Sequence, residues 1–213
     1  MSQSKAIAEA LLDTGAFKIS MDPLFTWSSG IKSPVYCDLR SLNSNVRIRR
    51  QIVDAFVELI NADEVDVIAG TSTAGIAWAA WVAEKLDKPM VYVRGTSKGH
   101  GTKKRVEGGM EAGQRVLVIE DLISTGGSSI NTVKALREDC EAIVTDVLAI
   151  TTYEMKKADI AFADLNVQAQ TLTDFSTLLS VVVDRGVFSD DQLMILKDFS
   201  SDPAGWAERN SLS

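Results

Sequence analysis

Cysteine and histidine are scarce in this chain of 213 residues. Its two cysteines, Cys37 and Cys140, stand in no CxxC or Cys/His spacing. The absence of such a spacing argues against a disulfide framework or a zinc site. It predicts that both cysteines are buried, structural free thiols in a reducing compartment. Hydrophobic residues make up 46% of the chain, and a chain of this length can bury roughly 70% of the surface that its unfolded form exposes. We therefore expect a single domain over residues 1–213 that needs no disulfide or metal for its stability.

Long apolar runs and an excess of basic charge are also missing. The longest uncharged stretch, residues 67–83, contains Gly70 and Gly75, whereas a membrane-spanning helix needs about 20 mostly apolar residues. The 22 basic and 29 acidic residues give a net charge of −7, which argues against a nucleic-acid or membrane-surface partner. Glu9 interrupts the N-terminal segment before a secretory signal can form. We expect a cytoplasmic protein with no nucleic-acid and no membrane partner.

The hydrophobic pattern predicts an α/β protein. Short apolar stretches alternate with helical ones, which is typical of a parallel sheet with helices on both faces. We expect strands at residues 65–69, 90–93, 115–119, 142–150 and 166–169, and helices at 5–14, 45–60, through 78–81, 128–138 and 190–199. Residues 25–37 predict two short strands around a Ser/Gly turn, and the polar tail from Ser200 is expected to fray. The N-terminal subdomain would span about residues 15–40 and the core about 45–200.

The first candidate site is an apolar strand that ends in two carboxylates. Glu120 and Asp121 follow residues 116–119, and a turn of small residues, 124–128, then opens a helix. Ligands of open parallel sheets sit beyond the carboxyl ends of the strands, and a helix N-terminus offers N–H groups to a phosphate. Because the acids would repel a phosphate, we expect them to hold ligand hydroxyls or a cation. The alternative is a solvated acidic pair beside an ordinary helix cap.

Two further segments follow predicted strands. Residues 94–109 carry five Lys or Arg against one Glu and include the one histidine, His100, which is typical of a loop that closes over a polyanionic substrate. A solvated basic hairpin is equally compatible with that pattern. Residues 70–75 match GxxxxG but lack the Lys-Ser/Thr of a P-loop, so they form either a second anion site or a tight turn. No GxGxxG occurs, which argues against a nucleotide-binding oxidoreductase.

Two conspicuous groups of residues are interpreted as structural. Trp78 and Trp81 lie one helical turn apart, so we expect them in the core or at a subunit interface. The cluster of Arg47, Arg49 and Arg50 predicts a solvated helix face. Neither group is expected to carry chemistry.

The motifs together resemble those of a known family. Residues 116–129 resemble the phosphoribosyl diphosphate signature of type I phosphoribosyltransferases. Residues 25–38 are similar to the hood that orotate phosphoribosyltransferases place over the base, and residues 94–108 are similar to their catalytic loop. The resemblance covers about residues 11–169, with three motifs in family order. It implies the type I phosphoribosyltransferase fold, in which a parallel sheet has helices on both faces and a small N-terminal hood.

The resemblance implies a reaction and its site residues. Orotate and phosphoribosyl diphosphate would give orotidine 5′-phosphate and pyrophosphate with Mg²⁺, in pyrimidine nucleotide synthesis, by a homodimer with shared active sites. Lys98, His100 and Asp121 would be catalytic, and Mg²⁺ would be held mainly by the substrate, with water-mediated contacts to Glu120 and Asp121. Phosphoribosyl diphosphate would contact Thr71, Ser72, Thr73, Ala74, Arg94, Lys98, His100, Glu120, Asp121, Leu122, Ile123, Ser124, Thr125, Gly126, Gly127 and Ser128. Orotate would contact Ser29, Lys32, Val35, Tyr36 and Ser124.

The chain departs from some members of the family. Many relatives carry a lysine where this chain has Gly95, and Lys103, Lys104 or Arg105 could supply the missing charge. An arginine that binds the orotate carboxylate in some members has no match near residues 151–154, which leaves the hood backbone and Lys32 for that role. Two alternatives stay open, a purine-type enzyme of the same fold and a non-catalytic regulator that senses phosphoribosyl diphosphate. The hood argues against the first, and the lack of a basic helix-turn-helix segment argues against the second.

Overall fold

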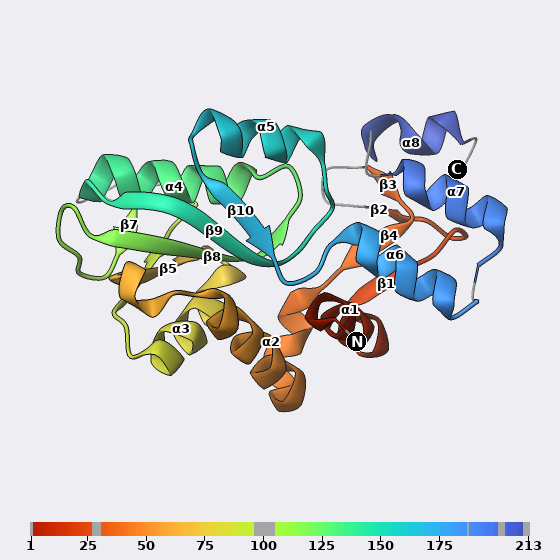
Figure 1. Ribbon diagram of the computed structural model, residues 1–213. Coiled ribbons are helices and arrows are strands. Elements are labelled where there is room, and N and C mark those ends of the chain that lie inside the picture. The colour runs from red at the N-terminus through yellow and green to blue at the C-terminus, as the bar shows by residue number, and fades with distance from the viewer. Residues whose placement is uncertain (1, 27–30, 96–104, 187, 200–202, 211–213) are drawn as a thin grey trace.

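A six-stranded sheet forms the centre of the protein (Figure 1). The computed structural model describes residues 2–26, 31–95, 105–186, 188–199 and 203–210. The strands are β5 (Val67–Thr71), β6 (Met90–Val93), β7 (Val106–Glu107), β8 (Arg115–Ile123), β9 (Ile143–Thr152) and β10 (Gln168–Thr171), in the order β10–β9–β8–β5–β6–β7. Neighbouring strands are parallel except for the pair β6–β7. The prediction of an α/β protein with a parallel sheet is confirmed.

Helices cover both faces of this sheet (Figure 1). They are α2 (Val46–Leu59), α3 (Gly75–Leu86), α4 (Gly127–Cys140) and α5 (Lys156–Asp164). Val118 and Val147 belong to the apolar core shared with α4 and α5, whereas Ile119 and Leu148 belong to the core shared with α2 and α3. Successive side chains of the central strands thus enter two different cores, which explains why those strands are apolar along their whole length.

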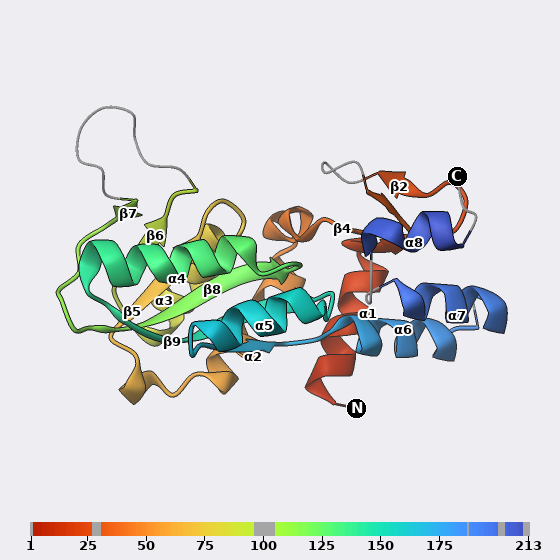
Figure 2. The same ribbon diagram turned by 90° about the horizontal axis from the view of Figure 1, so that it is seen from above.

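The N-terminal hood and the remaining helices lie beside the sheet (Figure 2). Two small antiparallel sheets, β1–β4 and β2–β3, form the hood. Its elements are β1 (Phe17–Ile19), β2 (Phe25–Thr26), β3 (Lys32–Ser33), β4 (Val35–Cys37) and the 3-10 helix η1 (Leu39–Ser44). The other elements are α1 (Gln3–Asp13), the 3-10 helix η2 (Ala62–Glu64), α6 (Phe175–Asp184), α7 (Asp190–Asp198) and α8 (Pro203–Arg209). Within the described residues, no helix is long and apolar enough to cross a membrane.

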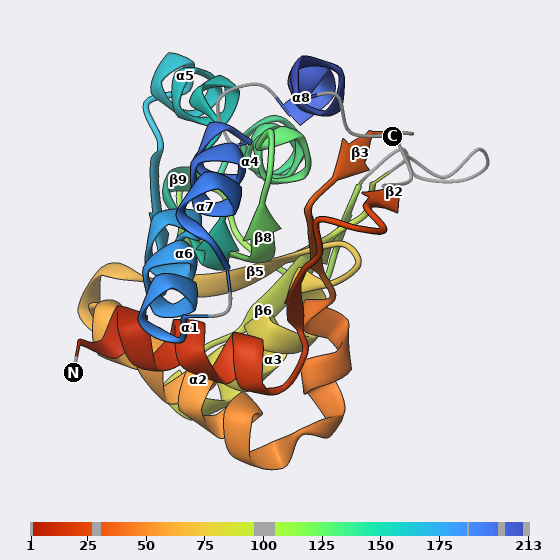
Figure 3. The same ribbon diagram turned by 90° about the vertical axis from the view of Figure 1, so that its right-hand side faces the viewer.

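The C-terminal segment differs from its prediction. Residues 203–209 form α8 instead of a frayed tail, and Trp206 in this helix is completely buried. Its indole Nε1–H donates to the carbonyl oxygen of Ile195 at 2.7 Å, and its ring meets Phe199 edge-on with centroids 5.4 Å apart. Helix α8 in turn lies against β3 of the hood (Figure 3). Burial of one large aromatic side chain therefore orders a segment whose composition is otherwise polar.

The structure confirms some of the smaller predictions and corrects others. Trp78 is buried as expected, and Trp81 meets it edge-on at 5.2 Å between ring centroids. Arg49 is not simply solvated, because its guanidinium lies 4.6 Å from the centre of the Trp81 ring and donates to the carbonyl oxygen of Asn43 at 3.0 Å. Both cysteines are free thiols as predicted, but each is only half-buried. Strand β1 and helices α5 and α6 were absent from the predicted set of elements.

Candidate functional site

A cavity of about 340 Å³ opens at the carboxyl ends of β5 and β8. From β5 the chain continues to β6 on one side, whereas β8 lies on the other side, so the strand order reverses between β5 and β8. Ligands of open α/β sheets bind in the crevice at such a point. The described residues that line the cavity are Tyr36, Cys37, Asp38, Leu39, Arg40, Ser72, Thr73, Ala74, Glu120, Asp121, Leu122 and Ser128. This cavity is the candidate functional site.

The turn of residues 72–74 joins β5 to α3 and forms one wall of the cavity. Ser72 is held in place because its backbone N–H donates to the carbonyl oxygen of Val93 at 3.0 Å and its hydroxyl donates to the same oxygen. No side chain caps α3 at Ala74. The backbone N–H groups of Thr73 and Ala74 have no hydrogen-bond partner among the described residues. With the positive end of the α3 dipole, they are available to an anion.

Gly75 brings α3 into main-chain contact with β8. A Cβ atom at Gly75 would lie 2.5 Å from the carbonyl oxygen of Ile119 and 3.2 Å from the Cα atom of Glu120. Only glycine fits such a close approach without a shift of the backbone. The turn 72–74 and the acidic end of β8 are therefore packed side by side.

Glu120 and Asp121 form a largely buried acid pair. Glu120 is 3% exposed, and its carboxylate accepts hydrogen bonds from the hydroxyls of Ser128 (2.8 Å) and Ser129 (3.1 Å) in the first turn of α4. The Asp121 carboxylate accepts the backbone N–H of Leu122 at 2.8 Å. The alternative of a solvated acidic pair is therefore wrong for Glu120.

The electrostatics of the acid pair follow from this burial. Burial raises the pKa of Glu120 to about 8, the nearby charge of Asp121 adds to the rise, and the hydrogen bond from Ser128 opposes it. Burial also raises the pKa of Asp121, against the hydrogen bonds that it accepts. Carboxyl groups with raised pKa values at a cavity are typical of functional sites. In this position they can accept hydrogen bonds from ligand hydroxyls.

A second candidate anion site follows β8. Residues 124–126 lead into α4, and Gly126 has a φ of +78°, which is accessible to glycine and strained for other residues. No side chain caps α4 at this position. The backbone N–H groups of residues 124–128 have no hydrogen-bond partner among the described residues. The N-terminus of this 14-residue helix is therefore open to a phosphate.

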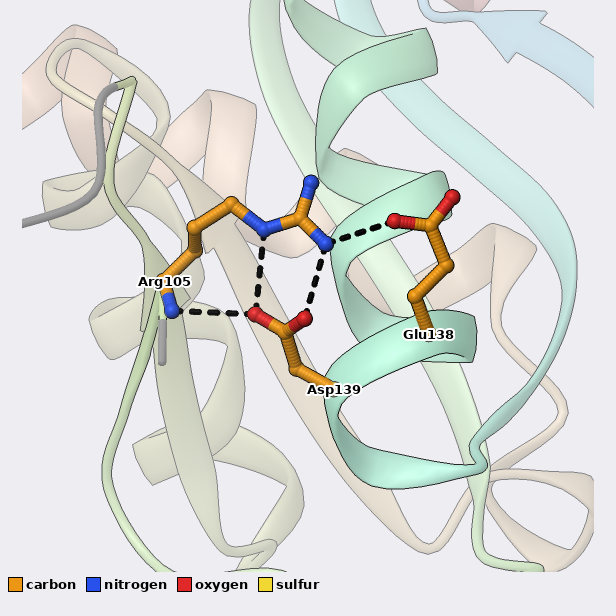
Figure 4. A network of polar contacts seen from close by, with 3 residues as sticks. All are labelled: Arg105, Glu138 and Asp139. Atoms are coloured by element: carbon orange, nitrogen blue, oxygen red, sulfur yellow. Dashed lines mark hydrogen bonds and ion pairs between the residues drawn. The ribbon is translucent and has the colours of Figure 1, made fainter. Parts of the chain in front are cut away.

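Arg105 ties the end of the segment between β6 and β7 to α4 (Figure 4). Its backbone N–H and its Nε both donate to Oδ2 of Asp139 at 3.0 Å, and its Nη2 donates to Oδ1 of Asp139 (2.8 Å) and Oε2 of Glu138 (2.7 Å). These hydrogen bonds, first those to Asp139, raise the pKa of Arg105 above its ordinary value. The Arg105 guanidinium already binds two carboxylates, so it is a poor replacement for the lysine absent at Gly95.

Arg94 lies at the other end of the same segment. Its Nη1 pairs with Oε1 of Glu107 at 3.1 Å, and its backbone N–H donates to the carbonyl oxygen of Arg105 at 2.9 Å. Its side chain does not line the cavity. The predicted catalytic residues Lys98 and His100 lie outside the described residues.

The carboxyl groups at the cavity fit a metal ion that takes few ligands from the protein. The described part of the chain holds no group of three or more His, Cys, Asp or Glu side chains placed to bind a metal ion. Glu120 and Asp121 supply two carboxyl groups at the cavity. Mg²⁺ commonly keeps several waters and binds through one or two carboxylates together with substrate phosphates. The residues present therefore fit Mg²⁺ carried largely by a phosphorylated ligand.

Comparisons with known proteins agree with this geometry. The family described as "Phosphoribosyl transferase domain" matches residues 39–160. The chain is 49% identical over 203 residues to an "Orotate phosphoribosyltransferase" of Bacillus caldolyticus, with 94% of this chain and 97% of the relative covered. The chain belongs to the orotate phosphoribosyltransferase family. The resemblance found in the motifs is thereby confirmed.

Solved structures support the same fold. The orotate phosphoribosyltransferase of Aeropyrum pernix matches with a TM-score of 0.73 and 30% identity, over 83% of this chain and 98% of that one. The UMP synthase of Leishmania donovani matches with a TM-score of 0.77 and 24% identity, over 93% of this chain and 42% of that one. The second likeness concerns the fold alone, because the identity is low and less than half of that chain is covered.

The structure brings together part of the site predicted for an orotate phosphoribosyltransferase. The predicted residues that line the cavity are Tyr36, Ser72, Thr73, Ala74, Glu120, Asp121, Leu122 and Ser128. Ser124, Thr125, Gly126 and Gly127 lie in the adjoining turn and the start of α4. Thr71 ends β5 with a buried hydroxyl that has no hydrogen-bond partner in the described part of the chain. Ile123 is buried at the end of β8.

The predicted orotate contacts are less closely gathered. Lys32 is exposed on β3, and the Val35 side chain is buried in the core instead of lining the cavity. Ser29 lies outside the described residues.

Sequence reasoning gave no role at the site to residues 37–40, which line the cavity with Tyr36. Cys37 and Asp38 belong to the hood motif, which was the available signal for them, whereas no pattern in the sequence marks Leu39 and Arg40. Strand β4 and η1 turn this whole segment toward the ends of β5 and β8.

Proposed function

We propose that the chain transfers the 5-phosphoribosyl group of phosphoribosyl diphosphate to N1 of orotate, in pyrimidine nucleotide synthesis. The products are orotidine 5′-phosphate and pyrophosphate. The observation that carries this proposal is the cavity at the ends of β5 and β8, where two uncapped helix N-termini flank a buried acid pair. The relatives named orotate phosphoribosyltransferase support orotate as the base.

The three parts of the site correspond to the three parts of the sugar substrate. The turn of residues 124–128 binds the 5′-phosphate, and the turn of residues 71–74 binds the diphosphate. Glu120 and Asp121 accept hydrogen bonds from the 2′- and 3′-hydroxyls of the ribose. This assignment places each anion at unpaired N–H groups and keeps the phosphates away from the carboxylates.

The base enters from the side of the hood. Tyr36 is 41% exposed and lines the cavity, and its ring lies 5.6 Å from that of Phe25. We assign this aromatic pair to the rim over the orotate ring. Lys32, exposed on β3, provides a cation for the orotate carboxylate, and Ser29, Val35 and Ser124 complete the predicted contacts.

The reaction forms the N1–C1′ bond as the bond between C1′ and the diphosphate oxygen breaks, and the electron pair of that bond leaves with pyrophosphate. Positive charge develops on the ribose and negative charge on the leaving group. The chain therefore acts by positioning and by electrostatic stabilisation, since deprotonated orotate needs no further activation. Glu120 and Asp121 would hold Mg²⁺ through water, with the substrate as its main ligand, and the metal would offset the charge on the diphosphate.

Other parts of the proposal concern assembly. We assign the chain to the cytoplasm and to a homodimer in which Lys98 and His100 of one subunit reach the diphosphate in the other, with Arg94 on the same group. The net charge of +4 in residues 94–109, within a chain of net charge −7, supports this role.

The test follows orotate absorbance after the protein is mixed with phosphoribosyl diphosphate and Mg²⁺. We expect orotate consumption that needs the metal and falls at least about 100-fold in Lys98→Ala and in Asp121→Asn, while Asp63→Asn, an exposed acid in η2, keeps full activity. If orotate persists while adenine or hypoxanthine is consumed, the purine alternative holds. If phosphoribosyl diphosphate binds and no base is consumed, the regulator alternative holds.

A further inference from the structure

One cavity-lining side chain has no part in the site as described so far. Arg40, in η1, lines the cavity together with the turn 72–74 and the acid pair. Its side chain is exposed, and it makes no hydrogen bond or ion pair with any other residue that the structure describes. This arginine is therefore available to a ligand.

Most other arginines of the described chain are occupied. Seven of them donate to a carboxylate or a backbone carbonyl, and they are Arg49, Arg94, Arg105, Arg115, Arg137, Arg185 and Arg209. Arg47 and Arg50 are unpaired within the described residues, but they lie exposed on α2 and do not line the cavity. Among the described arginines, Arg40 alone is both unpaired and part of the cavity lining.

The charges that line the cavity show why an unpaired cation matters at this position. Three acids line it, Asp38, Glu120 and Asp121, and Arg40 is the one cationic side chain among the described lining residues. The charge of Arg40 acts to lower the pKa of Asp121, against the effect of burial, so the two groups are electrostatically coupled across the cavity. A polyanion that enters this cavity meets net negative charge unless it lies against Arg40 and the helix N-termini.

We propose that Arg40 binds the diphosphate group of phosphoribosyl diphosphate. This inference rests on the proposed function, which places the diphosphate at the turn 72–74 on the same cavity. A guanidinium presents parallel N–H donors to two phosphate oxygens, whereas an ammonium acts as a single point charge. Arg40 supplies directional donors from η1 on the same cavity as the backbone N–H groups of the turn. The diphosphate is then held between a side chain of the hood region and the N-terminus of α3.

The test compares Arg40→Gln with Arg40→Lys in the full-length protein, and Arg50→Gln serves as the matched control. Inorganic pyrophosphate and phosphoribosyl diphosphate are titrated calorimetrically with Mg²⁺ present, and KM is measured for both substrates. We expect Arg40→Gln to weaken pyrophosphate binding and raise KM for phosphoribosyl diphosphate by about 10- to 100-fold. Arg40→Lys should recover part of the loss. KM for orotate and the Tm should stay at the values of the control.

Two results would overturn the inference. Pyrophosphate binding in Arg40→Gln equal to that in Arg50→Gln would show that Arg40 does not touch the diphosphate. A raised KM for orotate with unchanged pyrophosphate affinity would place Arg40 on the orotate carboxylate instead. A wild-type protein that binds pyrophosphate but consumes no orotate would refute the proposed function alone, since the pyrophosphate titration still decides the role of Arg40.

Discussion

Replacement of Trp206 by alanine measures how much α8 contributes to the fold. The side chain is completely buried, so its removal leaves a large cavity beside Phe199 and deprives the Ile195 carbonyl of its donor. Large-to-small changes at buried aromatic positions cost about 3–5 kcal/mol. Trp206→Phe keeps most of the ring and loses the N–H donor, so we expect about 1–2 kcal/mol. These are large fractions of the roughly 5–15 kcal/mol by which a domain is stable.

The same variant tests whether α8 supports the hood. Helix α8 lies against β3, which carries Lys32 and Ser33, so its loss should raise KM for orotate several-fold and leave pyrophosphate affinity unchanged. Urea unfolding followed by circular dichroism gives the free energy of unfolding. Met194→Ala, at a side chain 64% exposed on α7, is the control and should change it by less than about 0.5 kcal/mol. A Trp206→Ala protein as stable as this control would refute the packing argument.

Two more predictions concern Gly75 and Glu120, at the contact between α3 and β8. Gly75→Ala places a Cβ atom 2.5 Å from the Ile119 carbonyl oxygen. We therefore expect thermal unfolding to show a free energy of unfolding lower by about 1–3 kcal/mol, and we expect a raised KM for phosphoribosyl diphosphate. The control Gly109→Ala, where a Cβ atom would have nothing within 4 Å, should change neither quantity. Burial raises the pKa of Glu120 from 4.5 to about 8, so the unfolded chain loses a proton that the folded chain keeps, and stability falls as pH rises between these values. We therefore expect the free energy of unfolding of Glu120→Gln, relative to that of the wild type, to rise by about 2–4 kcal/mol between pH 5 and pH 8 in urea unfolding without Mg²⁺. A difference between the two proteins that does not depend on pH would contradict this.

The parts of the fold that could be predicted are those with a clear period. Strand β6 occupies residues 90–93 as expected, because its four apolar residues stand between a proline and an arginine. Helix α5 was missed because it buries few side chains, chiefly Ala158 and Phe162, and leaves Ile160 62% exposed. Helix α6 is apolar along most of its length, and such a run does not distinguish a buried helix from a buried strand.

The candidate site also has parts that could be predicted from the sequence and parts that could not. Glu120 and Asp121 could be recognised because two charged residues directly after a run of buried apolar residues are costly to bury without a ligand or partner. Arg40 could not be recognised, since it follows no periodic pattern and its position depends on how η1 packs near the ends of β5 and β8. Trp206 was missed for a related reason, because one aromatic residue in a polar tail gives no period from which burial can be inferred.

The contact of Gly75 with β8 has a consequence for how substrates can change. The distance between the turn 72–74 and the acid pair is set by main-chain atoms of α3 and β8, so under the proposed function it fixes the spacing between the sugar and its diphosphate. Of the residues assigned to the base, Lys32, Val35 and Tyr36 lie on the separate small sheets of the hood. If the proposed roles hold, substitutions in the hood can exchange one nucleobase for another while this main-chain spacing, and with it the phosphoribosyl donor, stays the same.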